Sequence, residues 1–178
     1  MGYRHSRQEI LDGAVALVLD EGLARLTFGS LARRSGVSDR IIVYYFPSKE
    51  ELIGEVLSVF GGRLQAALGP ALPAAVPDHV SFVRSVWPLL ATPRFDPVFA
   101  VFFEASGLAS AGVEPYRTMA AALVKGWVAW AEQSITGDAA HRRSEAAAAI
   151  ATIDGLLLMR QLSGAAAANR AAAAITRR

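Results

Sequence analysis

Residues 31–49 read LARRSGVSDRIIVYYFPSK, and this stretch decides the fold of the N-terminal part of the chain. Thr27, shortly before it, is a good N-cap, because its hydroxyl can accept a hydrogen bond from an orphan amide of the next helical turn. Gly36 can adopt the left-handed conformation that ends a helix sharply. Ser38 is a second N-cap, and Pro47 stops the helix that Ser38 begins. The spacing therefore predicts two short helices around a glycine turn, which is a helix-turn-helix.

The second of these helices has two different faces. Ile42 and Phe46 are four residues apart and can share a buried face, so the other side chains point outward. Because a helix-turn-helix places its second helix in a DNA groove, these outward side chains and the nearby caps and basic groups are candidates for DNA contact. The candidates are Thr27, Arg34, Ser38, Asp39, Arg40, Ile41, Tyr44, Tyr45 and Lys49. The alternative is that the basic groups are ordinary solvated surface charges.

The segment from about Arg7 to Leu52 resembles the DNA-binding domain of the TetR family of bacterial transcriptional repressors. The resemblance is carried by Thr27, Leu31-Ala32, Gly36-Val37-Ser38, Tyr44-Tyr45-Phe46 and the residues from Ser48 to Leu52. Val43 departs from the pattern, which usually has a tyrosine at that position. The resemblance implies a helix-turn-helix DNA-binding domain at residues 1–50 and a helical effector-binding and dimerisation domain at residues 51–178.

Composition agrees with a soluble cytoplasmic protein. The chain has 178 residues, is 53% hydrophobic and carries a formal net charge of +2, so its affinity for DNA would depend on where the basic groups lie. It has no cysteine, and therefore no disulfide or thiolate metal site. No basic-then-apolar leader begins the chain, and the alanine-rich stretch from Glu145 is interrupted at Thr152, Asp154 and Gly155. We expect no membrane-spanning segment and no membrane partner.

Capping and breaking residues predict further helices and little or no sheet, so the expected class is all-α. Ser48 should cap a fourth helix in a capping box with Glu51, although Gly61-Gly62 should weaken that helix. Three prolines make residues 69–77 an expected irregular linker. Four further helices and an alanine-rich last helix are predicted to begin near residues 78, 96, 115, 138 and 165.

The helices of the second part carry many large apolar side chains. The TetR resemblance implies that some of them line a cavity for a small apolar effector. The candidates are Trp87, Phe99, Phe102, Phe103, Met119 and Trp127, with Glu104, Arg94 or Asp154 supplying a polar contact. The alternative for each aromatic is ordinary core packing, which any helix bundle needs.

The last two helices are rich in alanine, which lets helix backbones approach closely. In the resembling family the corresponding helices form a four-helix bundle with a second copy, so we predict a homodimer. Ile150, Ile153 and Leu157 are expected to form an exposed apolar stripe at its interface. A two-fold dimer would set two reading helices about one DNA turn, roughly 34 Å, apart on a palindromic operator. The alternative is that alanine reflects helix propensity alone.

An enzyme is not expected. The three histidines have no metal-ligand spacing, and neither a glycine-rich phosphate loop nor a nucleophile elbow is present in the sequence. We therefore predict no catalytic residues, no metal site and no cofactor. The predicted function is a DNA-binding regulator, a repressor released from its double-stranded operator when an effector binds and moves the fourth helix. The alternative is an effector-independent DNA-binding protein, or an activator that works through protein contacts.

Overall fold

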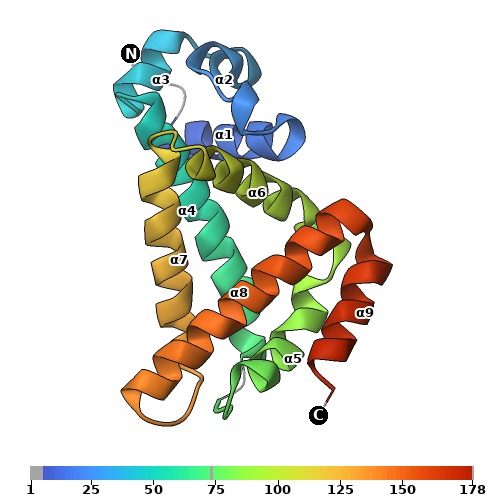
Figure 1. Ribbon diagram of the computed structural model, residues 1–178. Coiled ribbons are helices and arrows are strands. Elements are labelled where there is room, and N and C mark those ends of the chain that lie inside the picture. The colour runs from blue at the N-terminus through green and yellow to red at the C-terminus, as the bar shows by residue number, and fades with distance from the viewer. Residues whose placement is uncertain (1–5, 73, 178) are drawn as a thin grey trace.

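The computed structural model describes residues 6–72 and 74–177, and these residues fold almost entirely as helices (Figure 1). The α-helices are α1 (Arg7–Glu21), α2 (Phe28–Ser35), α3 (Asp39–Tyr45), α4 (Lys49–Leu68), α5 (His79–Leu90), α6 (Asp96–Ser110), α7 (Tyr116–Glu132), α8 (Ala139–Ser163) and α9 (Ala165–Ile175). Short 3-10 turns are η1 (Leu23–Arg25), η2 (Gly69–Ala71) and η3 (Pro93–Phe95). The predicted all-α class is confirmed. The first five residues of the predicted DNA-binding domain lie outside the described residues.

The predicted caps fix the ends of α2. The Thr27 hydroxyl accepts a hydrogen bond from the Ser30 amide at 3.0 Å, and the Ser30 hydroxyl accepts one from the Thr27 amide at 3.0 Å. Gly36 ends the helix in the left-handed conformation, with φ of 65°. Ser38 is the N-cap residue of α3 as expected, but its hydroxyl makes no capping hydrogen bond. Thr27 therefore fixes the start of α2, and Gly36 makes the turn between α2 and α3.

The start of α4 has only half of the predicted capping box. The Ser48 hydroxyl accepts a hydrogen bond from the Glu51 amide at 3.0 Å. The Glu51 carboxylate lies 3.9 Å from the Arg7 guanidinium instead of closing the box. Arg7 also pairs with Glu55, one turn further along α4. Glu51 and Glu55 therefore both face the Arg7 guanidinium.

Helices α1, α2, α3 and the first half of α4 form a head around one hydrophobic core. Ile42 and Phe46 are buried side by side in this core, which confirms that they share the inner face of α3. The same core extends to Val101 and Ala105 of α6 and to Tyr116 of α7. The head is therefore packed onto the rest of the chain, at one end of the molecule (Figure 1).

Helix α4 is shared between the head and the body. It runs without interruption through Gly61 and Gly62, so the glycine pair does not break it. Its first half contributes Leu52, Ile53 and Val56 to the core of the head. Its last turn contributes Leu68 to a second core, which α4 shares with α5, α6, α7, α8 and α9. Residues 69–77 contain the single helical turn η2 within the expected irregular linker.

Helix α8 crosses the body between α7 and α9 (Figure 1). Within the described part of the chain it is the one helix long and apolar enough to cross a membrane by length and composition, with a mean hydropathy of 1.2 over its best window. The core helix of a soluble protein passes the same test, so the absence of a membrane-spanning segment stays a prediction. A third of that window is buried inside the protein, where α8 packs against α5, α7 and α9. Arg160 near its end is also buried and donates hydrogen bonds to Asp96 at 2.6 and 2.9 Å.

Candidate functional site

The outer face of α3 is the centre of the predicted DNA-contacting surface. Asp39 and Arg40 are exposed in its first turn, and Arg40 makes no hydrogen bond or ion pair with another described residue. Tyr44 is 65% exposed, and its ring meets that of Tyr45 edge to face at 5.0 Å. Val43 is 43% exposed on the same helix. Val43 was not among the predicted contacts, although the helical period places it outside the inner face that Ile42 and Phe46 share.

The other predicted contacts differ in how freely they face outward. Thr27 and Ser38 are exposed at the N-caps of α2 and α3. Ile41 and Tyr45 are half-buried, since both also pack against the core of the head. Lys49 is half-buried in the first turn of α4. DNA contact by these residues stays a prediction.

Arg34 is exposed, but it forms ion pairs with two carboxylates of the same chain. Its guanidinium lies 2.5 Å from a carboxylate oxygen of Asp20 and 3.8 Å from one of Glu21. These ion pairs brace α2 against the end of α1. Contact between Arg34 and a DNA phosphate would therefore compete with two carboxylates, which favours a bracing role for this side chain.

Arg7 braces the other side of the head. Its guanidinium donates to both carboxylate oxygens of Glu55 and lies over the Phe46 ring, 4.6 Å from the centroid. The hydrogen bond from Arg7 lowers the pKa of Glu55 below its ordinary value. This contact ties the first turn of α1 to α4 and to the end of α3, so it fixes the tilt of the reading helix.

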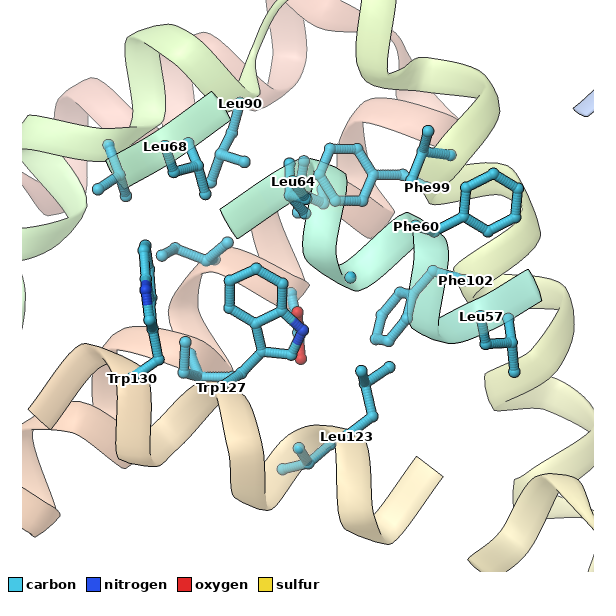
Figure 2. Close-up of a pocket in the computed structure, with 18 of the residues that line it drawn as sticks. Leu57, Phe60, Leu64, Leu68, Leu90, Phe99, Phe102, Leu123, Trp127 and Trp130 are labelled. Carbon is cyan, nitrogen blue, oxygen red and sulfur yellow. The ribbon is translucent and has the colours of Figure 1, made fainter. Parts of the chain in front are cut away.

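Helices α4 to α8 line a partly open, apolar cavity of about 80 Å³ (Figure 2). Its aromatic lining comes from every one of these helices except α8. The aromatic residues are Phe60, Phe82, Phe99, Phe102, Trp127 and Trp130. Figure 2 shows Trp127 and Trp130 projecting from α7, with Phe60 and Leu64 of α4 across the cavity from them. Phe99, Phe102 and Trp127, three of the predicted effector contacts, therefore lie together.

The cavity has a single carboxylate. Asp154 of α8 lines it, and burial raises the pKa of its carboxyl to about 6. The other two polar candidates lie elsewhere. Arg94 stacks over the Phe95 ring at 4.5 Å, and Glu104 accepts hydrogen bonds from the head.

Three of the predicted effector contacts are outside this lining. The Trp87 indole donates a hydrogen bond to the Asn169 side chain at 3.1 Å, between α5 and α9. Phe103 packs against the second core. Met119 packs against the head, where its terminal methyl would lie 3.0 Å from a Cβ added at Gly54. Helical periodicity gave no means of distinguishing core positions from cavity positions.

The cavity is small for a ligand. A dry cavity of roughly 150 Å³ is the size that takes a benzene molecule. At about 80 Å³ this one cannot take a larger molecule unless its walls move apart. Five helices form those walls, and α4 is both a wall and a part of the head.

Comparison with known proteins shows which family this chain resembles. Residues 10–56, from α1 into α4, match the model of "Bacterial regulatory proteins, tetR family". The "HTH-type transcriptional regulator BetI" of Rhizobium meliloti (strain 1021) is 26% identical over 174 residues, which cover 96% of this chain and 85% of that protein. The chain is therefore similar to regulators of the TetR family, whose model matches its first helices.

Two solved structures share the fold of this chain over nearly its whole length. A transcriptional regulator from Streptomyces coelicolor A3(2) is 25% identical with a TM-score of 0.68, covering 97% of this chain and 98% of its own. The multidrug binding protein EbrR, in complex with proflavin, is 22% identical with a TM-score of 0.67, covering 96% of both chains. The relatives from Rhizobium meliloti and Streptomyces coelicolor are described as transcriptional regulators.

The predicted dimer stripe of this regulator is not on its surface. Ile150, Ile153 and Leu157 are all buried, and all three line the cavity. The expectation that they are exposed is therefore wrong. The neighbouring face of α8 carries the exposed apolar side chains: Leu158 is 41%, Met159 39% and Leu162 77% exposed. Helix α8 has two apolar faces, and its larger β-branched side chains lie on the inner one.

Glu104 of α6 joins the head to the rest of the chain. Its two carboxylate oxygens accept hydrogen bonds from the Leu23 and Ala24 amides, at 2.8 and 2.9 Å. Gly22 ends α1 just before them, with φ of 88°, and a Cβ there would lie 3.0 Å from the Glu104 carboxylate. Phe102, two residues before Glu104 on α6, lines the cavity. Sequence reasoning assigned Glu104 to the effector, because a contact 81 residues away leaves no local signal.

Proposed function

We propose that this TetR-family regulator is a cytoplasmic homodimeric repressor, which leaves a palindromic operator when a small, largely apolar molecule enters the cavity. The observation that carries the proposal is the position of α4. Leu52, Ile53 and Val56 of this helix pack inside the head, and Leu57, Phe60, Gly61, Leu64 and Leu68 further along it line the cavity. A rigid helix that is part of both sites cannot move at one without moving at the other.

The size of the cavity gives the direction of the effect. A molecule larger than about 80 Å³ has to displace the walls, and α4 is the wall that continues into the head. Displacement of α4 in both subunits of a dimer would change the distance between the two α3 helices. Binding of DNA needs that distance to stay near one helical turn, roughly 34 Å. Ligand and operator therefore weaken each other's binding by the same factor.

The outer face of α8 supplies the surface for the dimer. Leu158, Met159 and Leu162 are exposed there on one side of the helix, while the adjacent α9 adds exposed alanines and Ile175. Small residues on both helices would let two copies approach closely. This face replaces the stripe of Ile150, Ile153 and Leu157, which is buried inside each subunit.

A small-molecule effector is supported by the neighbours as well as by the cavity. The solved structure of EbrR, which shares this fold, is a multidrug binding protein in complex with proflavin. The six aromatic residues of the cavity in this chain suit a ligand with a flat or bulky apolar body.

The proposal is tested by operator binding with and without ligand. Fragments of the source genome retained by the full-length protein at low ionic strength give the operator. Fluorescence anisotropy then measures its affinity at fixed salt, with each of a library of apolar molecules that raise the melting temperature. A repressor of the proposed kind loses operator affinity with at least one such molecule. Unchanged affinity with every stabilising molecule favours the effector-independent alternative.

A further inference from the structure

Asp154 is out of place in a cavity for a purely apolar ligand. The other described residues that line the cavity are aliphatic or aromatic, apart from Gly61, so Asp154 is the single ionisable group among them. Its carboxylate makes no hydrogen bond or ion pair with another described residue. Asp154 is half-buried, and this burial disfavours the charged form of a carboxylate that has no partner to replace the lost hydration.

No positive side chain within the described residues is placed to neutralise it. Helices α4, α5, α6 and α7 present only uncharged side chains to the cavity. Arg160 lies on the same helix as Asp154, but its guanidinium is committed to Asp96 through hydrogen bonds of 2.6 and 2.9 Å. Burial is accordingly the one cause that shifts the pKa of Asp154. A positive partner for Asp154 has to enter from outside.

We propose that the cavity takes an organic cation with an apolar body, and that Asp154 provides its counter-charge. This inference rests on the proposed function, because it names the ligand class of the same cavity. The aromatic lining fits that class. The rings of Trp127 and Trp130 meet edge to face at 5.2 Å, and Phe82 meets Trp130 at 6.3 Å and 90°. Rings set at right angles present faces in several directions, and the face of an indole attracts a cation without a hydrogen bond.

Two probes of one shape separate charge from size. Phenyltrimethylammonium and tert-butylbenzene have the same outline, but only the first is charged, and neither can donate a hydrogen bond. Since both must push the cavity walls apart to the same extent, the cost of opening cancels when their affinities are compared. Trp127 and Trp130 line the cavity, so their fluorescence in the full-length protein reports binding, with calorimetry as the second readout.

The test compares the wild type with D154N and D154E at pH 8. The ratio of the affinity for phenyltrimethylammonium to that for tert-butylbenzene should fall at least about tenfold in D154N, which removes the charge with little change of shape. It should be largely kept in D154E, which retains the charge. Affinity of the wild type for the cation should also fall about tenfold from pH 8 to pH 5, because the carboxyl, with a pKa of about 6, becomes protonated. Binding of tert-butylbenzene, and both probes in D154N, should not depend on pH.

Three results would overturn the inference. The first is a D154N ratio equal to that of the wild type, with circular dichroism showing both proteins folded. The second is a cation affinity that does not change with pH. In both cases, binding of tert-butylbenzene would still show that the cavity takes apolar ligands. The proposed function would then stand. The third is binding of neither probe, after which operator affinity measured with the apolar library decides the proposed function by itself.

Discussion

Arg40 is the side chain of α3 best placed to reach a base edge, because it is exposed in the first turn and has no partner among the described residues. Replacing it with alanine should weaken operator binding by about 1 to 3 kcal/mol and relax the preference at one base pair. Anisotropy against a set of single-base operator variants measures both effects. Arg33→Ala, which removes an exposed arginine from α2, is the matched control and should lower affinity without changing preference. A uniform loss over all variants in R40A would make Arg40 a phosphate contact instead.

Asp154 should make the stability of the empty protein depend on pH. Its pKa is about 6 when folded and lies near the ordinary value of 3.8 when unfolded, so the folded state holds the extra proton between those values. The raised pKa therefore costs stability above pH 6, and this cost disappears as pH falls toward 4. D154N should raise the free energy of unfolding at pH 8 by about 1 to 3 kcal/mol, and by almost nothing at pH 4. Urea unfolding at both pH values measures it, and an equal gain at both would contradict the buried, ionised carboxylate.

At the scale of the elements, α6 connects the cavity to the head through Glu104. Glu104→Gln removes the charge and one of the two acceptors for the Leu23 and Ala24 amides, so it should cost about 1 to 3 kcal/mol of stability. It should also shrink the effect of a ligand on operator affinity, because the head is then held to α6 less firmly. Anisotropy titrations with and without ligand give this coupling.

Glu114→Gln is the control for that change. The Glu114 carboxylate accepts a hydrogen bond from Thr118 at 3.3 Å, four residues along the chain, and it joins no two parts of the molecule. Its substitution should leave the coupling as it is. If E104Q and the wild type show equal coupling, α6 does not transmit the effect of the ligand to the head.

The head was predictable from sequence because its signals are local. Thr27, Gly36 and Pro47 act on neighbouring residues, and the four-residue interval from Ile42 to Phe46 is enough to identify the inner face of α3. The TetR resemblance was readable from the same segment.

The body was less predictable because its assignments depend on packing partners far along the chain. A helix such as α8 has two apolar faces, and periodicity does not say which one is inside, so Ile153 was assigned to the surface and Leu158 to none. The division of the aromatics between cavity and core, as for Trp127 and Trp87, is likewise set by which helix lies opposite. Arg34 was assigned to DNA because nothing in the sequence links it to Asp20, 14 residues earlier.

For the whole molecule, the exposed face of α8 should control assembly. Leu162 is 77% exposed, and Leu162→Glu should raise the dissociation constant of the dimer at least about tenfold by burying a charge in the interface. Light scattering after size exclusion measures the mass over a range of concentrations. Val113→Glu makes the same chemical change at a 40% exposed site in the loop between α6 and α7, and should stay dimeric. If L162E forms a dimer of unchanged stability, the interface lies on another face of the protein.

The coupling between cavity and head is tested most directly from the side of the ligand. A stabilising ligand is titrated by calorimetry into the full-length protein alone, and then into the protein saturated with its operator. The affinity for ligand should fall in the presence of operator, by the same factor by which saturating ligand lowers the affinity for operator. Equal ligand affinity with and without operator would contradict the coupling through α4.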